Sequence, residues 1–412
     1  MKISIVIPTR ERGIYLRSSI QSVLSIKDQD IELIVADNAS SDNTAEVVAG
    51  FSDPRLTYLP SKQRVSMREN FNRSVFASTG AYVIVFGDDD AILPAQFPML
   101  RRLLEENRPD GLSWERATYG WPIKGFGKKT GGLRFYKNQC FGAPVEYDSR
   151  DNMGRLQQAK LGAMIPAPDI YHGCVSRAYL ERIAPQPGVF FDSIIPDVNF
   201  QYRSTYCGGR FVHMRHPFTI NGYSPASTGF AHTSPKTGAE GKKIGSSFVL
   251  ENKADPFDDI LDHKLTIQLV FFSTLETMRA RGGFDHPKPD YVAWYQYALT
   301  AMRRKPEQAA HIETVLKGYA EQTGTTAQLE EARRMAPSAK RTLKERLDRL
   351  WSQLHSFRVS AAFDGENTVY TATQVMDEIL GLDLNAVLDG TTPPSSAWLA
   401  ARKRSKAFES QL

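Results

Sequence analysis

The chain of 412 residues contains little cysteine and no long hydrophobic run. Its three cysteines are Cys140, Cys174 and Cys207. Their odd number and wide spacing exclude a disulfide framework and a Cys-x-x-Cys metal pair, and they predict a reducing, cytoplasmic setting. No stretch of 18 consecutive apolar residues occurs, so no membrane span is predicted. The short apolar run at residues 3–7 lacks the length and cleavage site of a signal peptide.

The chain also lacks a strong excess of charge of either sign. It has 51 Lys and Arg against 46 Asp and Glu, a net charge of +5. A surplus this small suits a phosphate-bearing small ligand or an anionic membrane surface, and it does not predict nucleic acid as a partner. Ordinary glycine and proline content and 41% hydrophobic residues exclude a disordered or collagen-like chain.

The first hundred residues alternate between strand and helix patterns. Short, nearly continuous apolar runs are separated by segments in which apolar residues recur at helical spacing. This alternation predicts a doubly wound α/β fold, with a mixed, mainly parallel sheet covered on both faces. The expected strands are 3–7, 31–36, 56–59 and 82–86, and the expected helices are 16–24, 44–51 and 70–78.

Beyond this region the pattern changes twice. Residues 111–233 are rich in glycine, proline and aromatics and predict loops and short strands that form one wall of a cleft. A Gly/Lys/Ser-rich segment at 234–247 is followed by helical periodicity from Asp255 onward. We therefore expect three parts, residues 1–110, 111–235 and a helical C-terminal region at 236–412.

Three consecutive carboxylates, Asp88, Asp89 and Asp90, directly follow the apolar run that ends at Phe86. Carboxylates this close repel one another, so packing them at a strand end is unfavourable unless a cation neutralises them. Mg²⁺ and Mn²⁺ prefer oxygen ligands and bridge to phosphates. The cluster predicts a divalent cation site, and the alternative is a solvated acidic turn or helix cap.

Four ordered motifs together resemble the inverting family 2 glycosyltransferases of the GT-A fold, over about the first 220 residues. A lone acidic triplet would not be specific, but four motifs in this order are. They are Ile5–Arg10 at the first strand, Ile34–Thr44 at the second strand and its turn, Asn70 with Asn72 and Gly80–Tyr82, and Asp88–Asp90 as the DXD motif.

The resemblance implies a nucleotide-sugar site in residues 1–110 and an acceptor site in residues 111–235. Asp37 would accept a hydrogen bond from the nucleobase or the ribose of the donor. The alternative is that Asp37 caps the turn at the end of its strand. A UDP-sugar is the donor that the family favours. The residues expected to bind this donor are Pro8, Thr9, Glu11, Asp37, Asn70, Asp88 and Asp89.

The resemblance also implies a Mn²⁺ or Mg²⁺ ion that bridges the diphosphate. Its expected ligands are Asp90, Asp88 and His216. The family often has Asp where this chain has Gly87, which leaves two assignments open: Asp88 and Asp90 form the DXD pair, or Asp89 and Asp90 hold the metal and the ribose. His216 is either a late metal ligand or an ordinary surface or core histidine.

An inverting transferase needs a general base that deprotonates the acceptor hydroxyl. By its similarity to the family's acceptor-side motif, Asp197 takes this place, with Pro196 where the family commonly has Glu. Asp192 is the competing candidate, and a plain helix cap is the alternative role for Asp197.

The resulting hypothesis is a metal-dependent inverting transferase that moves a sugar to a hydroxyl of a saccharide or lipid-linked saccharide in surface polysaccharide synthesis. Two alternatives remain, a sugar nucleotidyltransferase and a non-catalytic nucleotide or glycan binding module. The first would need a glycine-rich phosphate loop after the first strand, and Pro8–Arg12 supplies none. The retained acidic cluster argues against the second.

The C-terminal third lies outside the resemblance. A basic amphipathic helix is expected at Lys340–Leu354. It is compatible with peripheral attachment to the inner face of the cell membrane, with packing on the catalytic domain, or with a homodimer contact. Residues 221–229 are either a lid over the donor or a plain loop.

Overall fold

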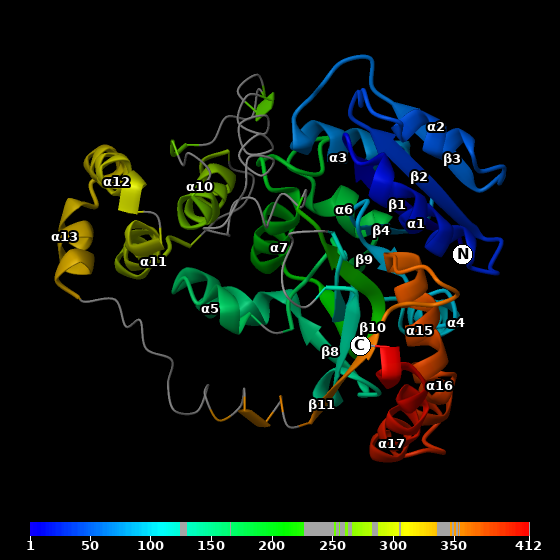
Figure 1. The fold of residues 1–412 in the computed structure, drawn as a ribbon. Helices are drawn as coiled ribbons and strands as arrows, with labels where there is room; N and C mark the ends of the chain where they lie inside the picture. The colour runs from blue at the N-terminus through cyan, green and yellow to red at the C-terminus, as the bar shows by residue number, and fades with distance from the viewer. Residues whose placement is uncertain are drawn as a thin grey trace.

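The computed structural model describes residues 1–123, 130–164, 166–225, 251–252, 255, 260–262, 266–281, 287–304, 306–335, 347, 350–351, 353 and 355–411. A mixed β-sheet forms the centre of the molecule, with helices against both faces (Figure 1). The predicted α/β class with a mixed sheet and a helical C-terminal region is confirmed. How the chain divides at residues 110 and 235 stays a prediction.

The main path of the sheet runs in the order β11-β7-β6-β9-β4-β1-β2-β3. Neighbours among the last four of these strands are parallel, and β9 lies antiparallel between β4 and β6. The carboxyl ends of β1, β2 and β4 therefore meet at one edge of the sheet, where open α/β sheets bind ligands. The bounds are β1 Ile3–Thr9, β2 Ile31–Asp37, β3 Leu56–Pro60, β4 Tyr82–Val85, β6 Gly111–Gly120, β7 Gly132–Tyr136, β9 Gly173–Ser176 and β11 Ser356–Ser360.

Strand β10 (Arg210–Tyr223) connects the site to the rest of the sheet. It runs parallel to β6 along its length and antiparallel to the short strands β5 (Ala91–Ile92) and β8 (Pro144–Asp148). Register shifts between Met214 and Thr219 bend it around the core. Its C-terminal end thereby arrives beside the acidic cluster that precedes β5.

Alternate residues of the central strands point into two separate cores. Ile5 belongs to the larger core, under α1 (Gly13–Leu24), α4 (Phe97–Asn107) and α15 (Val369–Leu380). Val6 belongs to the core under α3 (Met67–Ala77), α6 (Arg177–Ile183) and α7 (Pro196–Cys207). This period of two on a sheet covered on both faces explains why the strands read as continuous apolar runs. The remaining N-terminal helix is α2 (Thr44–Ala49).

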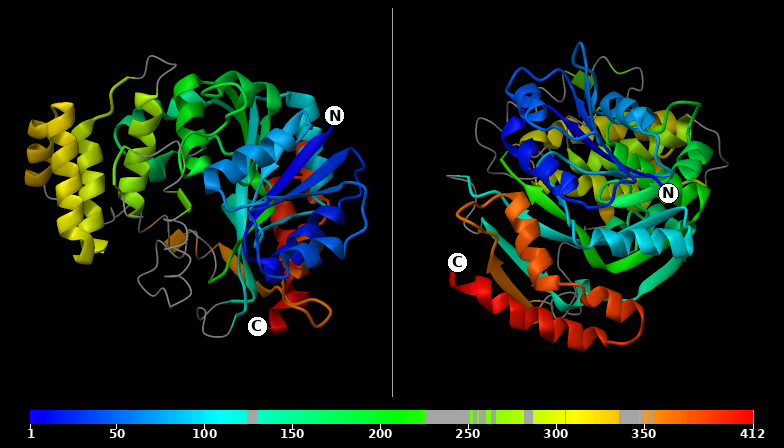
Figure 2. Two further views of the ribbon diagram at one scale, coloured as in Figure 1. Left: turned by 90° about the horizontal axis from the view of Figure 1, so that it is seen from above. Right: turned by 90° about the vertical axis from the view of Figure 1, so that its right-hand side faces the viewer.

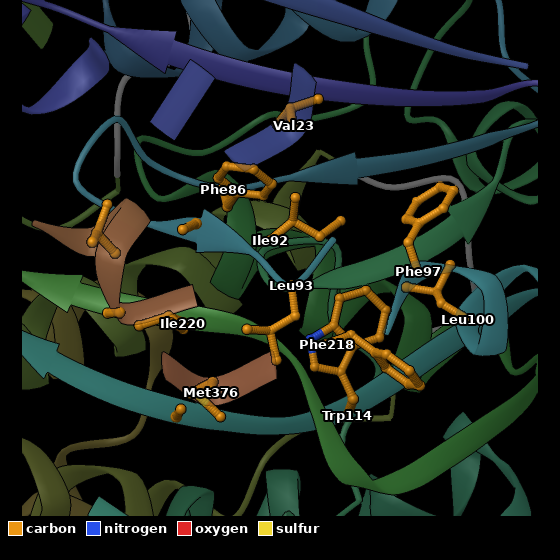
Figure 3. Packing of buried hydrophobic residues seen from close by; sticks show 14 of the residues in the cluster. Val23, Phe86, Ile92, Leu93, Phe97, Leu100, Trp114, Phe218, Ile220 and Met376 are labelled. Atoms are coloured by element: carbon orange, nitrogen blue, oxygen red, sulfur yellow. The ribbon is translucent and has the colours of Figure 1, made fainter. Parts of the chain in front are cut away.

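Part of the larger core is formed by residues on either side of the acidic cluster. Phe86, Ile92 and Leu93 flank the three carboxylates in sequence, and all three side chains are fully buried. Figure 3 shows them packed with Phe218 and Ile220 of β10. The polar cluster is thus held between apolar anchors on both sides.

Four helices form a further layer with a core of their own. They are α10 (Ile267–Ala280), α11 (Tyr291–Arg304), α12 (Ala309–Thr323) and α13 (Thr326–Arg334). Their core includes Phe272 and Trp294 and continues into Tyr202 of α7 and Leu156 of α5 (Met153–Gln157). In the left view of Figure 2 these helices lie on the side of the molecule away from the N-terminus. Helix α7 therefore contacts both the sheet and the helical layer.

The last part of the chain returns to the sheet. Strand β11 pairs with β7, and α15 is followed by α16 (Asp383–Leu388) and α17 (Pro394–Ser405) at the opposite end of the molecule from α11–α13 (Figure 1). Gln96 donates to the carbonyl of Gly381 at 3.0 Å, which fixes the end of α15 to the start of α4. Residues 356–405 also contribute buried apolar side chains to the larger core.

Two of the predicted features fall largely on residues outside the description. Most of the expected basic helix at 340–354 is not described; Leu347, Leu350 and Trp351, which are, have exposed side chains. The segment 234–247 and residues 226–229 of the expected lid are also outside the described residues. Within the described ranges, none of the helices has the length and hydropathy needed to cross a bilayer.

The importance of the core behind the cluster can be tested with a pair of phenylalanines. Phe86→Ala is expected to lower the free energy of unfolding by about 3–5 kcal/mol, because it leaves a cavity in the core between the sheet and the helices that cover it. Phe76→Ala, whose side chain is 68% exposed, is the matched control and should change stability by about 0.5 kcal/mol or less. Urea unfolding followed by circular dichroism measures both; equal effects would contradict the assignment of the core.

Candidate functional site

Polar side chains from the ends of β1, β2 and β4 meet at one edge of the sheet. The hydroxyl of Thr9 donates to Oδ2 of Asp88 at 2.7 Å, and the backbone N–H of Asn38 donates to the carbonyl of Thr9 at 3.0 Å. Thr9, Asp37 and Asp88 are nearly fully buried. The structure thus brings together residues that the sequence places almost eighty positions apart.

Asp37 and Glu11 shape the turn that follows β2. Oδ1 of Asp37 accepts from the N–H and hydroxyl of Ser40, and Oδ2 accepts from the hydroxyl of Tyr58 at 2.7 Å. Glu11 has a positive φ of 54°. Its carboxylate accepts from the N–H groups of Ser41 and Asp42, and also pairs with Arg64. Both expected donor-site carboxylates therefore organise backbone around the site.

Pro8 and Asn70 lie beneath this turn. Pro8 stands opposite Ala36 in the β1–β2 register. The amide of Asn70 donates to the carbonyl of Ala36 at 3.1 Å, and its oxygen accepts from Nε of Arg73 at 2.8 Å. Arg73 in turn donates to the carbonyl of Asp37 at 2.7 Å. Asn70 thus positions an arginine under the strand ends.

Asp90 differs from its two neighbours because all its contacts point into the protein. Oδ2 accepts from the N–H of Gly87 at 2.7 Å and from the hydroxyl of Tyr171 at 2.6 Å, and it lies 3.1 Å from Nε2 of His172. Oδ1 accepts from the N–H of Gly222 at 2.8 Å. Burial would raise the pKa of Asp90, but His172 and these hydrogen bonds outweigh burial and lower it. A carboxylate with this many donors holds the fold together.

Asp88 and Asp89 have different surroundings. Asp88 lies 3.1 Å from the guanidinium of Arg12; burial raises its pKa, and Arg12 partly opposes that. The carboxylate of Asp89 accepts from the hydroxyl of Ser224 at 2.9 Å, and its carbonyl accepts from Nε1 of Trp121 at 3.0 Å. A Cβ at residue 222 would lie 1.8 Å from that carbonyl, so this position requires glycine.

The chemistry of the cluster fits a hard divalent cation at Asp88 and Asp89, whose oxygens are the ligand type that Mg²⁺ and Mn²⁺ prefer. It does not fit at Asp90, whose two oxygens are already occupied by protein donors. Among the described residues, no group of three or more His, Cys, Asp or Glu side chains is arranged to hold a metal ion. Within the described chain, Arg12 is the cation that contacts Asp88.

His216, an expected metal ligand, is a core residue and is not brought to the acidic cluster. Its ring is fully buried; Nδ1 accepts from the N–H of Phe141, and Nε2 lies 3.2 Å from the amide oxygen of Gln96. Burial lowers the pKa of His216 to about 3, so the ring is neutral. The histidine that contacts the cluster is His172.

On the acceptor side, Asp197 stands in the first turn of α7, directly after Pro196. Burial raises the pKa of Asp197, against the opposing effect of hydrogen bonds from backbone N–H groups of the helix start. The carboxylate of Asp192, the competing candidate, is held by two side chains of α7. It is 1% exposed, accepts from Arg203 at 2.6 Å and accepts from Asn199 at 2.8 Å. The geometry therefore favours Asp197 over Asp192 as a proton acceptor.

Sequence reasoning missed four residues between the two halves of the site. Tyr171 and His172 contact Asp90 from the segment before β9, and His172 has a positive φ of 55°. Asp169 lies 3.8 Å from Arg116 of β6. Burial raises the pKa of Asp169 to about 6, and the nearby charge of Asp197 adds to this. No motif marked these residues, because they come from segments that meet only through the sheet.

The carboxyl group of Asp169 gives a pH-dependent test. Because its pKa is about 6 in the folded protein, against 3.8 ordinarily, the folded state binds this proton more tightly than the unfolded state. The stabilisation is complete below about pH 4 and is lost as the pH rises through 6. Between pH 4 and 7 the wild type should therefore lose about 2–3 kcal/mol relative to Asp169→Asn.

Urea unfolding at intervals of one pH unit measures this difference. Asp364→Asn is the control, since Asp364 is exposed and in a turn with a positive φ that Asn also adopts. A difference between Asp169→Asn and wild type that stays constant with pH would contradict the assignment.

Comparison with known proteins identifies the first part of the chain. Residues 4–159 match the family model for glycosyl transferase family 2. A β-1,3-glucosyltransferase of Campylobacter jejuni, named for its substrate GalNAc(5)-diNAcBac-PP-undecaprenol, is 31% identical over 108 residues, which cover 26% of this chain and 35% of that protein. The abequosyltransferase RfbV of Salmonella typhimurium is 32% identical over 111 residues, which cover 26% of this chain and 33% of that protein. The chain thus spans about a third of the length of these relatives.

Solved structures with similar folds include residues 1–349 of TarS from S. aureus in complex with UDP-GlcNAc. It shares 13% identity, with a TM-score of 0.45, over 82% of this chain and 93% of that one. A mannosyltransferase from Pyrobaculum calidifontis in complex with GDP-Man and Mn²⁺ shares 16% identity, with a TM-score of 0.38, over 80% of this chain and 85% of that one.

All four sequence motifs of the resemblance lie inside the matched range, and they meet at the carboxyl edge of the sheet. The resemblance is therefore confirmed where it was strongest: residues 4–159 match the model of glycosyl transferase family 2.

Proposed function

We propose that this protein is an inverting glycosyltransferase that moves a sugar from a nucleotide-diphosphate sugar to an acceptor hydroxyl. The observation that carries the proposal is the position of Asp197. It is a carboxylate with a raised pKa, at the start of a helix on the acceptor side, while the other candidate base is held in a buried ion pair. A raised pKa makes an aspartate a better proton acceptor near neutral pH.

The donor occupies the edge where β1, β2 and β4 end. Pro8, Thr9 and Glu11 line the pocket for the nucleobase of the donor. Asp37 accepts a hydrogen bond from the nucleobase or the ribose, and Asn70 supports this surface through Arg73. A UDP-sugar is the proposed donor, as the family resemblance implies. Asp88 and Asp89 lie at the position of the ribose and diphosphate.

A Mn²⁺ or Mg²⁺ ion would be held by Asp88 and Asp89, and it would neutralise charge on the departing nucleoside diphosphate. Asp90 contributes indirectly, since its hydrogen bonds to Gly87 and Gly222 fix the loop that carries these two carboxylates. Because Arg12 already contacts Asp88, it competes with the cation for that carboxylate. We therefore expect the ion and the diphosphate of the donor to bind together.

The proposed acceptor is a saccharide or a lipid-linked saccharide in surface polysaccharide synthesis. One relative is named for an undecaprenyl-diphosphate-linked acceptor and another for an abequose transfer. We propose that the reaction takes place in the cytoplasm, at the inner face of the cell membrane. Membrane attachment or dimer contact through the C-terminal third is part of the same proposal.

Removing the proposed base should separate chemistry from donor binding. Asp197→Asn is expected to lower kcat by about a hundredfold or more, because Asn cannot accept the proton, while the Kd for the nucleotide-sugar stays unchanged. Asp389→Asn, at a half-exposed carboxylate beyond α16, is the matched control. Turnover is measured as acceptor-dependent nucleotide release over a panel of donors. Equal kcat in Asp197→Asn and wild type would remove Asp197 from the mechanism.

The competition at Asp88 can be measured without turnover. Without nucleotide, Arg12→Ala should bind Mn²⁺ about three- to tenfold more tightly than wild type, because the guanidinium no longer neutralises Asp88. Asp88→Asn should bind Mn²⁺ at least about tenfold more weakly. Arg17→Ala, on helix α1, which begins directly after Arg12, but beside Phe51, is the control and should match wild type.

Titration followed by electron paramagnetic resonance of free Mn²⁺ gives these affinities. The same affinity in Arg12→Ala, Asp88→Asn and wild type would place the cation elsewhere.

A further inference from the structure

A cavity lies beside α7, at the junction between the sheet and the layer of helices α10–α13. Its volume is about 630 Å³. Residues 159–163 form one wall, Val198, Gln201 and Tyr202 of α7 form a second, and Phe271 of α10 and Tyr297 of α11 complete it. These walls come from parts of the chain that fall outside or at the border of the family match at residues 4–159. The cavity is therefore built largely by segments that the family match does not cover.

The cavity begins next to the proposed base. Val198 directly follows Asp197, and Gln201 and Tyr202 stand about one helical turn further along α7. Burial raises the pKa of Tyr202, and Tyr297 and Asp197 both add to that effect, which places the phenol near both side chains. A ligand in the cavity would thus lie within one or two helical turns of the Asp197 carboxylate.

One group in the cavity wall is left unsatisfied. Tyr202 is 1% exposed, and its hydroxyl has no hydrogen-bond partner within the part of the chain that the structure describes. The ring itself is fixed, edge-on to Trp294 at 6.3 Å. A buried hydroxyl without a partner costs free energy that a bound hydroxyl or carbonyl would recover. This points to a polar ligand.

The rest of the lining indicates which polar ligand fits. Phe271 and Tyr297 are only partly buried aromatic side chains. Aromatic rings beside an amide, here Gln201, and a phenolic hydroxyl suit a molecule that has both an apolar C–H face and hydroxyl groups. A pyranose ring has this combination, whereas a lipid chain would leave the Tyr202 hydroxyl unsatisfied.

We propose that this cavity binds a saccharide unit of the acceptor, next to the sugar whose hydroxyl is glycosylated. Tyr202 donates to a ring or hydroxyl oxygen of that unit, and Phe271 and Tyr297 contact its C–H face. The assignment as an acceptor subsite rests on the proposed glycosyltransferase function. The cavity then selects which glycan can be extended.

A larger side chain at Gly162 can fill the cavity without disturbing the fold. A Cβ built at Gly162 meets no atom within 4 Å, so a side chain there enters open space. Gly162→Phe is therefore the test variant. Gly318→Phe is its matched control, because a Cβ at Gly318 on α12 also meets nothing within 4 Å and Gly318 does not line the cavity. Tyr202→Phe removes only the unsatisfied hydroxyl.

Binding is measured by saturation-transfer difference NMR with a panel of methyl glycosides of glucose, galactose, mannose and N-acetylglucosamine. Wild type and Gly318→Phe should show the same transfer to at least one glycoside. Gly162→Phe should abolish it, and Tyr202→Phe should weaken the affinity about three- to tenfold, the effect of one lost hydrogen bond. Unchanged transfer in Gly162→Phe, or no transfer from wild type to any glycoside, would overturn the proposal.

Nucleotide release from the donor panel without acceptor separates this proposal from the proposed function. Wild type and Gly318→Phe should release nucleotide slowly and equally, since Gly318 does not line the cavity. Release in wild type with no effect of Gly162→Phe on glycoside binding would overturn the cavity assignment alone. Glycoside binding that Gly162→Phe abolishes, without release from any donor, would leave a saccharide site and overturn its assignment to an acceptor.

Discussion

The buried carboxylate of Asp90 joins three segments that are far apart in sequence. It accepts from Gly87 in its own loop, from Tyr171 before β9 and from Gly222 at the end of β10, and it lies against His172. Such a buried charge is tolerated because every donor around it is supplied by the fold. The position of the loop at residues 87–90 and the approach of β10 both depend on this one group.

That constraint divides the acidic cluster into two roles. Asp90 is turned inward and structural, and this fixes Asp88 and Asp89 at the edge where β1 and β2 end. Arg12 supplies a positive charge next to Asp88. The mild net charge of +5 is thus a poor guide to the site, where three carboxylates gather at one strand end and Arg12 pairs with one of them.

Helix α7 couples the two halves of the molecule. A buried ion pair joins Arg203, in the second half of the helix, to Asp192 in the segment before it, and Asp197 lies in the first turn. The same helix gives Tyr202 to the core of α10–α13. The distance between the proposed base and the proposed acceptor cavity is therefore set by one helix, so segments beyond the family match would influence acceptor choice.

The amino-acid pattern by itself determined the α/β class, the strands β1, β2 and β4, and the family whose model residues 4–159 match, because apolar periodicity and short motifs are local properties. It also placed Thr9, Asp37 and Asp88 at one sheet edge, since parallel strands end together. Only the tertiary structure decided that Asp90 is structural, that His216 is a core residue and that His172 takes its place beside the cluster. Those assignments depend on contacts between segments up to 132 residues apart, which no local pattern contains.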